Sequence, residues 1–450
     1  MKNYKSLIFG LAVIGVSSLS AQNPIVRNQF SADPTARVFN GKVYVFPSHD
    51  IPTPKDQKQL RKDWFCMADY HVFSSENLTD WTDHGTIVSQ NKVAWVDSTS
   101  YSMWAPDCIE RNGKYYFYFP ANKNIAGTNG RKGFGIGVAV ADKPEGPYIP
   151  QAEPIKGVNG IDPNVLIDKD GQAYLYWSMG NLFVAKLKEN MLELDSEPLA
   201  IPDLPQKGLK EGPYTFERNG IYYLTFPHVE NKIERLEYAI GDNPMGPFKM
   251  TGVIMDESPE NCWTNHLSIV QYNNQWYLFY HHNDYSPKFD KNRSIRVDSL
   301  FFDTDGKIQK VIPTFRGVGV TSAKENIQLD RYSNISKNGA FIALLDTVNT
   351  FTGWKTILKT PEAWVQYNTV DFGSKKLKTV DVKAQSENGG TLQIRLDKVD
   401  GPIVVEVTIP KGNDWKIVEA RFSKAQKGVH NLFVVLKDTP AEIDWIRFKN

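Results

Sequence analysis

Residues Ile161–Trp177 read IDPNVLIDKDGQAYLYW, and this stretch decides the fold. It begins with the acidic Asp162 and a short apolar run, and after the turn Lys169-Asp170-Gly171 it ends in an alternating aromatic strand. An Asp-Gly turn between two such runs is a strong hairpin signal, because the turn needs positive φ and the flanks suit a pleated surface. The stretch therefore predicts a β-hairpin with a carboxylate at its start.

The same unit occurs five times along the chain. The other copies are DPTARVFNGKVYVFPS from Asp33, APDCIERNGKYYFYFP from Ala105, EGPYTFERNGIYYLTFP from Glu211 and NHLSIVQYNNQWYLFYH from Asn265. A spacing of roughly 50–70 residues is reasonable for propeller blades that carry loops. Five copies predict a five-bladed β-propeller, in which the first strand of each blade lies nearest the axis. Asp33, Asp162 and Glu211 would then converge on one central cavity.

The N-terminus has the layout of a secretory signal peptide. Lys2 and Lys5 precede the apolar run Leu7–Val16, and small polar residues follow up to Ala21. The run is too short to span a bilayer, and no later stretch is apolar enough to do so. No cysteine follows it, which argues against a lipid anchor. We expect residues 1–21 to be cleaved and the mature protein to be soluble and secreted or periplasmic.

Composition excludes several classes of partner. The chain has 52 Lys and Arg residues against 51 Asp and Glu residues, so nothing points to nucleic acid or to an anionic surface. Cys66, Cys108 and Cys262 are scattered and odd in number. They form neither a disulfide framework nor a metal-ligand spacing, and we interpret them as buried free thiols.

The long repeat stops near Ser322, and short alternating strands at close spacing follow. Among them are WVQYNTVDF, LKTVDVKAQ, LQIRLD, IVVEVTI, HNLFVVL and IDWIRF. Six or more short strands between Gly, Asn and Pro turns indicate a β-sandwich. The chain is thus predicted to be all-β, with a propeller at residues 22–323 and a sandwich at 324–450. No long linker separates them, so we expect the two domains to touch.

Three carboxylates around one cavity suit glycoside hydrolysis. A protonated carboxyl donates to the leaving oxygen, while an ionised one attacks or activates a nucleophile. A third carboxylate nearby would raise the pKa of the acid by like-charge repulsion. Asp and Glu before Pro are also common turn formers. Three of them at corresponding positions of a repeat favour the functional interpretation.

The motifs that carry these carboxylates resemble glycoside hydrolase family 43 over about residues 28–318. They are Asp33-Pro34, Trp104-Ala105-Pro106-Asp107, Ile161-Asp162-Pro163 and Glu211-Gly212-Pro213. The resemblance implies a five-bladed propeller and inversion of anomeric configuration. It also implies that Asp33 is the general base, Glu211 the general acid, and Asp162 the residue that orients the acid and tunes its pKa. An inverting site needs its two working carboxyls about 6.5–9.5 Å apart, to leave room for a water.

The same resemblance extends to three further residues. It implies that Trp104 walls the subsite for the non-reducing sugar, and that Arg293 bonds sugar hydroxyls near the acid, with a surface cation as the alternative. His266 in TNHLSIV resembles a histidine on the propeller axis, beside calcium or water. One imidazole is a poor calcium ligand by itself, so water would complete the shell. His49 in PSHD follows the first repeat strand and is a candidate sugar contact, with a plain loop residue as the alternative.

The C-terminal segment resembles family 6 carbohydrate-binding modules, which implies a jelly-roll sandwich. The motifs are IQLDRYS, WVQYNTVDFGS, LQIRLDKVDGPI, GVHNLFVVL and IDWIRF. Asp330 and Asp444 match positions that help to hold a structural calcium in such modules. Modules that grip sugar in the loop cleft have an Asn where this chain has Glu442. Trp354 and Trp415 could still stack on a sugar ring, and a purely structural sandwich is the alternative.

Two functional hypotheses follow. The first is an exo-acting α-L-arabinofuranosidase or β-xylosidase that acts on side chains or oligosaccharides of plant cell-wall polysaccharide; endo-arabinanase and exo-β-galactosidase activities also occur in the family. The second is a non-catalytic glycan-binding propeller, against which the intact Asp33, Asp162 and Glu211 argue. Calcium, in the sandwich or on the propeller axis, is the one cofactor expected; no organic cofactor is predicted.

Overall fold

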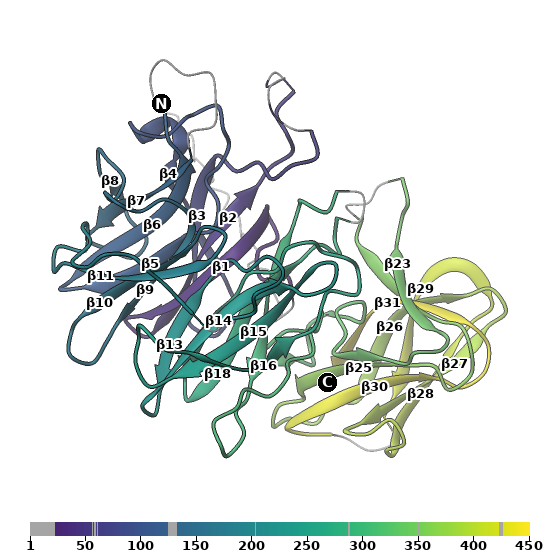
Figure 1. Cartoon of the computed structure of the whole chain (residues 1–450). Helices are drawn as coiled ribbons and strands as arrows, with labels where there is room; N and C mark the ends of the chain where they lie inside the picture. The colour runs from purple at the N-terminus through teal and green to yellow at the C-terminus, as the bar shows by residue number, and fades with distance from the viewer. Residues whose placement is uncertain are drawn as a thin grey trace, which may run out of the picture.

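The computed structural model describes residues 23–55, 57, 60, 62–124, 133–202, 204–286, 289–348, 352–422 and 426–450. The predicted signal peptide, residues 1–21, lies outside the described residues. Figure 1 shows two units, a larger one coloured purple to teal and a smaller one in green and yellow. Within the described ranges, no helix is long and apolar enough to cross a membrane.

The larger unit consists of five antiparallel sheets, four with four strands and the last with three. Blade I contains β1 (Phe30–Phe39), β2 (Lys42–Asp50), β3 (Asp69–Ser75) and β4 (Thr82–Ser89), after which comes the short 3-10 helix η1 (Gln90–Lys92). Blade II contains β5 (Asp107–Arg111), β6 (Lys114–Asn122), β7 (Phe134–Ala141) and β8 (Ile149–Pro150). Blade III contains β9 (Ile161–Ile167), β10 (Ala173–Ser178), β11 (Leu182–Leu187) and β12 (Leu199–Ala200). Blade IV contains β13 (Tyr214–Arg218), β14 (Ile221–Val229), β15 (Glu234–Gly241) and β16 (Lys249–Met255). Blade V contains β17 (Ser268–Tyr272), β18 (Gln275–His282) and β19 (Ser294–Leu300).

Each predicted hairpin forms the first two strands of one blade. The turns contain a residue with positive φ at the expected place, namely Gly41, Gly113, Gly171, Gly220 and Asn274. The first strands β1, β5, β9, β13 and β17 contact one another in a closed ring around the axis. The five-bladed propeller predicted from the repeat is therefore confirmed, and the starts of the hairpins do face one central space.

Residues 23–25 close the ring by bonding to the free edge of blade V. The side-chain amide of Asn23 donates to the carbonyl of Val297 at 3.2 Å and accepts the Val297 N–H at 2.9 Å. The N–H of Ile25 donates to the carbonyl of Ile295 at 3.0 Å. In the other blades a fourth strand bonds to the backbone of the third strand. Blade V has three strands, and residues 23–25 supply these bonds to β19 instead.

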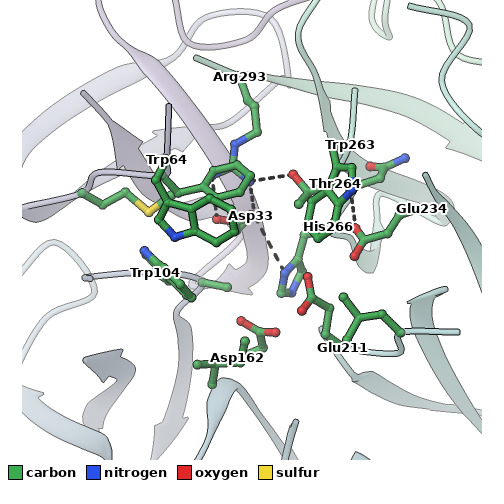
Figure 2. Close-up of a pocket in the computed structure, with 16 residues that line it drawn as sticks. Asp33, Trp64, Trp104, Asp162, Glu211, Glu234, Trp263, Thr264, His266 and Arg293 are labelled. Atoms are coloured by element: carbon green, nitrogen blue, oxygen red, sulfur yellow. Dashed lines mark hydrogen bonds and ion pairs between the residues drawn. The ribbon is translucent and has the colours of Figure 1, made fainter. Parts of the chain in front are cut away.

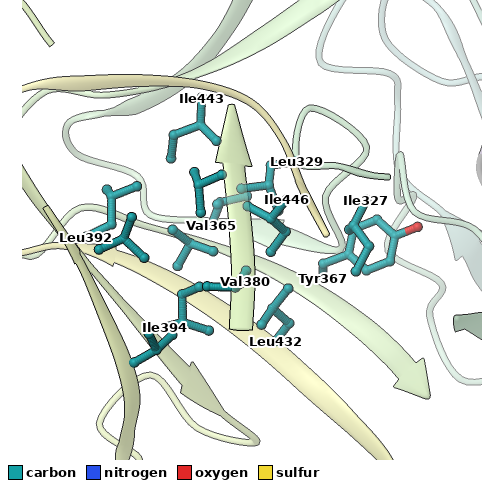
Figure 3. Close-up of a cluster of buried hydrophobic side chains, with 14 of the residues drawn as sticks. Ile327, Leu329, Val365, Tyr367, Val380, Leu392, Ile394, Leu432, Ile443 and Ile446 are labelled. Atoms are coloured by element: carbon teal, nitrogen blue, oxygen red, sulfur yellow. The ribbon is translucent and has the colours of Figure 1, made fainter. Parts of the chain in front are cut away.

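The smaller unit is a sandwich of two six-stranded sheets. One sheet contains β20 (Thr321–Ser322), β22 (Asn334–Ile335), β25 (Trp364–Asp371), β27 (Gly390–Leu396), β28 (Ile403–Ile409) and β30 (Val429–Leu436). The other contains β21 (Ile327–Gln328), β23 (Ala340–Leu344), β24 (Trp354–Leu358), β26 (Thr379–Ser386), β29 (Gly412–Arg421) and β31 (Ala441–Lys449). Figure 3 shows aliphatic side chains of both sheets meeting between them, among them Val365, Leu432, Val380 and Ile443. The predicted sandwich is thus confirmed.

The two units are in direct contact through arginines and aromatic rings. Arg316 donates to the carbonyl of Asn368 at 3.1 Å and to the hydroxyl of Thr369 at 2.9 Å. Arg331 lies over the ring of Tyr285 and donates to the carbonyl of Asn23 at 3.2 Å. Because these guanidinium groups span the boundary with several directed bonds, the sandwich is braced against the propeller.

Candidate active site

The starts of the inner strands surround a cavity of about 230 Å³. Figure 2 shows Trp64 and Trp104 on one side of it, Glu211 and Glu234 on the other, and Asp162 at its far end from Arg293. Its lining combines four carboxylic acids with four aromatic rings and other side chains: Asp33, Asp162, Glu211, Glu234, Trp64, Phe65, Trp104, Trp263, Met67, Ala105, Ile161, Leu209, Thr264, Asn265, His266 and Arg293. An apolar wall with a few convergent polar groups is typical of a small-molecule site.

Asp33 is held as an ionised carboxylate. It lies at an irregularity in the register of β1, with a left-handed φ of 49°, so the chain turns its side chain into the cavity. Ser48 donates a 2.6 Å hydrogen bond to one carboxylate oxygen, and Arg293 pairs with the other at 3.0 Å. Burial acts to raise the pKa of Asp33, but Arg293 above all opposes it, and the pKa falls to about 2.

Arg293 is engaged entirely by the protein. Its side chain donates to both oxygens of Asp33 and both oxygens of Asp50 and, at 3.0 Å, to the hydroxyl of Thr264. These bonds use all five N–H groups of the guanidinium. The residue is 2% exposed and lies beside Asp33, whereas the family resemblance implied sugar hydroxyls near Glu211. The geometry therefore favours a role in fixing two buried carboxylates.

Replacing Arg293 with Met is expected to lower the free energy of unfolding by about 3–5 kcal/mol, because two buried carboxylates lose their partner. The depressed pKa of Asp33 gives the sign of the pH dependence. In the wild type this stabilisation is fully present above about pH 4 and is lost as the pH falls toward 2. Urea unfolding of both proteins at pH 7 and pH 3 measures it. The control is Lys310→Met, which removes an exposed pair with Asp256 and should cost less than about 1 kcal/mol. An equal loss in both variants would contradict the assignment.

Asp162 and Glu211 lie close together on neighbouring blades. Asp162, on β9 with a φ of 56°, accepts bonds from the Ser178 hydroxyl at 3.0 Å and from the N–H of Gly212 at 3.1 Å. The second bond fixes the backbone directly after Glu211. A side chain in place of Gly212 would meet the ring of His266 at 3.0 Å. Burial, and then the charge of Glu211, raises the pKa of Asp162 to about 7, and burial also raises the pKa of Glu211.

Glu234, the first residue of β15, is a fourth carboxyl of the site and was not predicted from the sequence. It is 1% exposed, and one oxygen accepts the N–H of Asn265 at 2.6 Å. The charge of Glu211 acts on the Glu234 carboxyl, and two carboxylates that repel each other favour a proton on one of them. Burial, followed by the charge of Glu211, raises the pKa of Glu234 well above its ordinary value. The pair is therefore expected to retain one proton near neutral pH.

Aromatic rings form the wall of the cavity. Trp104 lines it as expected and packs on Phe134 with a ring distance of 4.8 Å. Its indole N–H has no hydrogen-bond partner among the described residues. Two further lining residues, Trp64 and Trp263, were not predicted from the sequence. Three indoles around a cavity provide the flat apolar faces on which sugar rings stack.

Two histidines lie next to Asp33. His266 lines the cavity, and its Nδ1 is 3.9 Å from a carboxylate oxygen of Asp33, so its central position is as expected. His281 was not predicted. Its Nδ1 accepts the backbone N–H of Asp33 at 3.0 Å, and its Nε2 faces the carbonyl of Thr264 at 3.1 Å. Burial, and then Arg293, lowers the pKa of His281 well below its usual range, so the ring is neutral and acts as a brace for the strained Asp33 backbone.

The remaining predicted residues lie outside the cavity lining. His49 bonds to Asp69 at 2.7 Å and is not among the lining residues, so the sugar contact suggested for it lacks support. Asp330 and Asp444 lie in the sandwich and are both buried. One oxygen of Asp330 has no hydrogen-bond partner among the described residues. Burial raises the pKa of Asp330 to about 6, and the charge of Asp444 acts in the same direction. Two buried carboxylates with a free oxygen fit a hard cation such as calcium.

Comparison with known proteins also divides the chain into two parts. Residues 21–308 match the profile of glycosyl hydrolases family 43, and residues 345–450 match that of the carbohydrate binding module family 6. The chain is 38% identical to "Xylosidase/arabinosidase 43A" of Humicola insolens over 334 residues, which cover 63% of this chain and 98% of that protein. It is 27% identical to "Arabinoxylan arabinofuranohydrolase" of Paenibacillus polymyxa, over 92% of this chain and 71% of that protein.

A solved structure is similar to the propeller. It is that of a β-xylosidase/α-arabinofuranosidase from a compost microbial metagenome, in complex with xylotriose and in a calcium-free form. The two chains superpose with a TM-score of 0.57 and 34% sequence identity, and the match covers 65% of this chain and 97% of the other. The similarity thus includes nearly all of the neighbouring protein, and in this chain it corresponds to the propeller, which contains the cavity.

Proposed function

Because the chain belongs to glycosyl hydrolases family 43, we propose that it is an inverting, exo-acting glycosidase that releases terminal α-L-arabinofuranose or β-D-xylose from plant cell-wall polysaccharide side chains or oligosaccharides. One observation carries the proposal. A single cavity holds the ionised Asp33 together with the partly buried Glu211 and the buried Glu234, two carboxyls whose pKa values are both raised. An ionised base and a protonated acid are what inverting hydrolysis requires.

In the proposed mechanism, Asp33 removes a proton from the attacking water while Glu211 protonates the departing oxygen. Arg293 and Ser48 keep Asp33 ionised, and His281 fixes its backbone. Asp162 holds the chain after Glu211 through the N–H of Gly212. All of these groups are in place before substrate arrives, so little reorganisation is needed when charge develops.

The size of the cavity supports action at a chain end. Its volume of about 230 Å³ is below the roughly 300–1,000 Å³ of pockets that enclose drug-sized molecules. Such a space suits one sugar ring with its water rather than several consecutive rings. The proposed arabinose or xylose specificity also agrees with the names of the similar proteins from Humicola insolens and from compost. Export of the mature protein would fit a polymeric substrate.

The test is the initial hydrolysis rate of the mature protein on aryl α-L-arabinofuranoside beside aryl β-D-xyloside, with NMR of the product anomer. A clear preference for one glycoside, with inverted product, supports the proposal and identifies the terminal sugar. Retention of configuration, or no turnover of either glycoside by folded protein, contradicts it. Turnover of linear arabinan without turnover of the aryl glycosides would indicate endo-action instead.

Calcium is the cofactor that the residues fit. His266 lies beside carboxylates in the cavity, where water would complete a coordination shell, and Asp330 with Asp444 offers oxygen ligands in the sandwich. Calcium in the sandwich would add to the ion pairs that the two buried carboxylates already make, Asp330 with Arg331 at 3.2 Å and Asp444 with Lys383 at 2.7 Å. We expect chelator treatment to lower the melting temperature, and added calcium to restore it in the wild type but not in Asp330→Asn. An unchanged melting temperature after chelation would contradict a bound calcium.

Replacing Glu234 with Gln is expected to move the alkaline limb of the pH profile of kcat/KM to lower pH by about one unit or more, a shift of about 1.4 kcal/mol in proton affinity. The reason is that Glu211 then no longer shares its proton with a second carboxyl, so like-charge repulsion no longer retains that proton. The acidic limb, set by Asp33, should not move. The control is Glu230→Gln, a half-exposed glutamate that pairs with Arg235. An alkaline limb that stays in place would contradict the shared proton.

A further inference from the structure

A second cluster of chemically active side chains lies on blade I, outside the cavity. It contains His49 on β2 with Asp69 and His71 on β3. Ser48 pairs with Tyr70, so the next residue on β2, His49, lies opposite Asp69. His71 follows two residues later, and residues two apart project from the same face of a strand. The sheet itself therefore brings the three side chains together, without help from a loop.

We propose that His49, Asp69 and His71 bind one divalent transition-metal ion of the zinc type. The ligand atoms of the three side chains all lie within 4.8 Å of one another. His49 Nδ1 is 2.7 Å from a carboxylate oxygen of Asp69, and the two imidazole rings have their centroids 5.4 Å apart. Without metal, Nδ1 of His49 donates its proton to Asp69, and an ion bound at that nitrogen would displace the proton. Zinc bonds of about 2.0–2.1 Å in tetrahedral geometry need ligand atoms about 3.3–3.4 Å apart. Side-chain rotations that shorten the largest distance between ligand atoms by about 1.5 Å would bring the three side chains to this geometry.

The tautomer of His71 is already the one that a metal requires. Its Nδ1 lies 3.0 Å from a carboxylate oxygen of Asp83, which can only accept, so Nδ1 carries the proton. Its Nε2 therefore carries the lone pair, which accepts a hydrogen bond from the Thr86 hydroxyl at 3.1 Å in the absence of metal and would bind the ion in its place. A carboxylate behind a ligating imidazole fixes the ring and raises its basicity, as in many zinc sites. Asp83 would take that role here.

Charge and exposure both suit an exchangeable ion. The side chains of His49, Asp69 and His71 are 22%, 25% and 17% exposed, so an ion can reach them and is still partly shielded. Asp69 and Asp83 supply two negative charges against the two positive charges of the ion. Two imidazoles favour zinc, nickel or copper over calcium and magnesium, which prefer oxygen ligands. Within the described ranges, this is the one group of three His, Cys, Asp or Glu residues with ligand atoms this close.

The position of the cluster gives a bound ion a structural effect. His49 directly precedes Asp50, which holds Arg293, and Asp69 lies two residues after Met67 in the cavity wall. An ion that joins β2 to β3 would therefore stabilise the position of Asp50, and through it the Arg293 guanidinium that pairs with Asp33. Binding to the folded protein alone raises its stability by mass action, which provides a readout independent of hydrolysis.

The test is calorimetric titration of the chelator-treated full chain with zinc chloride, and visible absorption with cobalt chloride as a spectroscopic probe. We expect one zinc ion per chain at this site, a visible cobalt band, and an increase in melting temperature. His49→Ala and His71→Ala should each remove this binding event, and Asp83→Asn should weaken it by about 10–100-fold. His266→Ala and His430→Ala, matched changes at other histidines, should leave it intact.

Several results would overturn the proposal. One is a wild type that takes up zinc without saturation at one equivalent; another is binding unchanged in His49→Ala and His71→Ala. Loss of binding in His266→Ala alone would place the ion in the cavity instead. Because the two blade I variants could also be destabilised, each is compared with the wild type by its melting temperature without metal. The decisive quantity is the zinc-induced increase, which should vanish in the variants that remain folded.

Discussion

Asp33→Asn is expected to lower kcat/KM by about 10²–10⁴-fold on oligosaccharides and on aryl glycosides alike. An amide cannot accept the proton of the attacking water, and no leaving group, however good, replaces that step. The ionised state of Asp33 is built into the structure, because Arg293 and Ser48 together lower its pKa to about 2. Asp33 is therefore ionised throughout the neutral pH range, and its replacement should lower the hydrolysis rate of every substrate.

The measurement is kcat/KM of Asp33→Asn on an aryl glycoside with a good leaving group, with and without sodium azide. A small anionic nucleophile needs no base, so azide should restore part of the rate and yield a glycosyl azide. Ser48→Ala is the matched control: it removes one hydrogen bond from Asp33 but leaves the carboxylate, and should cost far less. A residual rate above about a tenth of the wild type without azide would place the base elsewhere.

The fold and three of the four cavity carboxylates could be predicted because they belong to the periodic part of the sequence. A hairpin repeated five times predicts five blades, and the starts of the hairpins must converge wherever the blades form a ring. Asp33, Asp162 and Glu211 occupy those starts, and all three line the cavity. The prediction that Cys66, Cys108 and Cys262 are buried free thiols is also confirmed.

The features that were missed have no such regularity. Glu234 begins the third strand of blade IV, and Trp64 and Trp263 lie on long connections, so no repeat marks them. The partners of Arg293 could not be predicted, because they are far from it in the sequence. Its guanidinium donates to Asp33 and Asp50, which precede it by more than 240 residues. The position of His49, in contrast, could have been predicted. His49 directly follows Ser48 on β2, and the Ser48 side chain contacts Asp33. Strand parity alone therefore turns His49 to the opposite face.

Glu211→Gln is expected to separate two classes of substrate. Oligosaccharides, whose departing sugar oxygen needs a proton, should lose about 10²–10⁴-fold in kcat, whereas aryl glycosides with acidic phenols should lose much less. KM should change little, because an amide fills the same space in the cavity. The alkaline limb of the pH profile should also disappear, since the shared proton of Glu211 and Glu234 no longer controls the rate.

The comparison that decides this is a series of aryl glycosides with phenols of increasing pKa, measured for the wild type and Glu211→Gln. A steep dependence on the leaving group in the variant, and a shallow one in the wild type, would identify the lost function as proton donation. Glu217→Gln is the control and should behave as the wild type, because Glu217 lies on β13, which begins three residues after Glu211, but pairs with Lys169 outside the cavity. If Glu211→Gln slowed all members of the series equally, the donor would have to be sought in Glu234, because that carboxyl lines the same cavity and its pKa is raised well above its ordinary value.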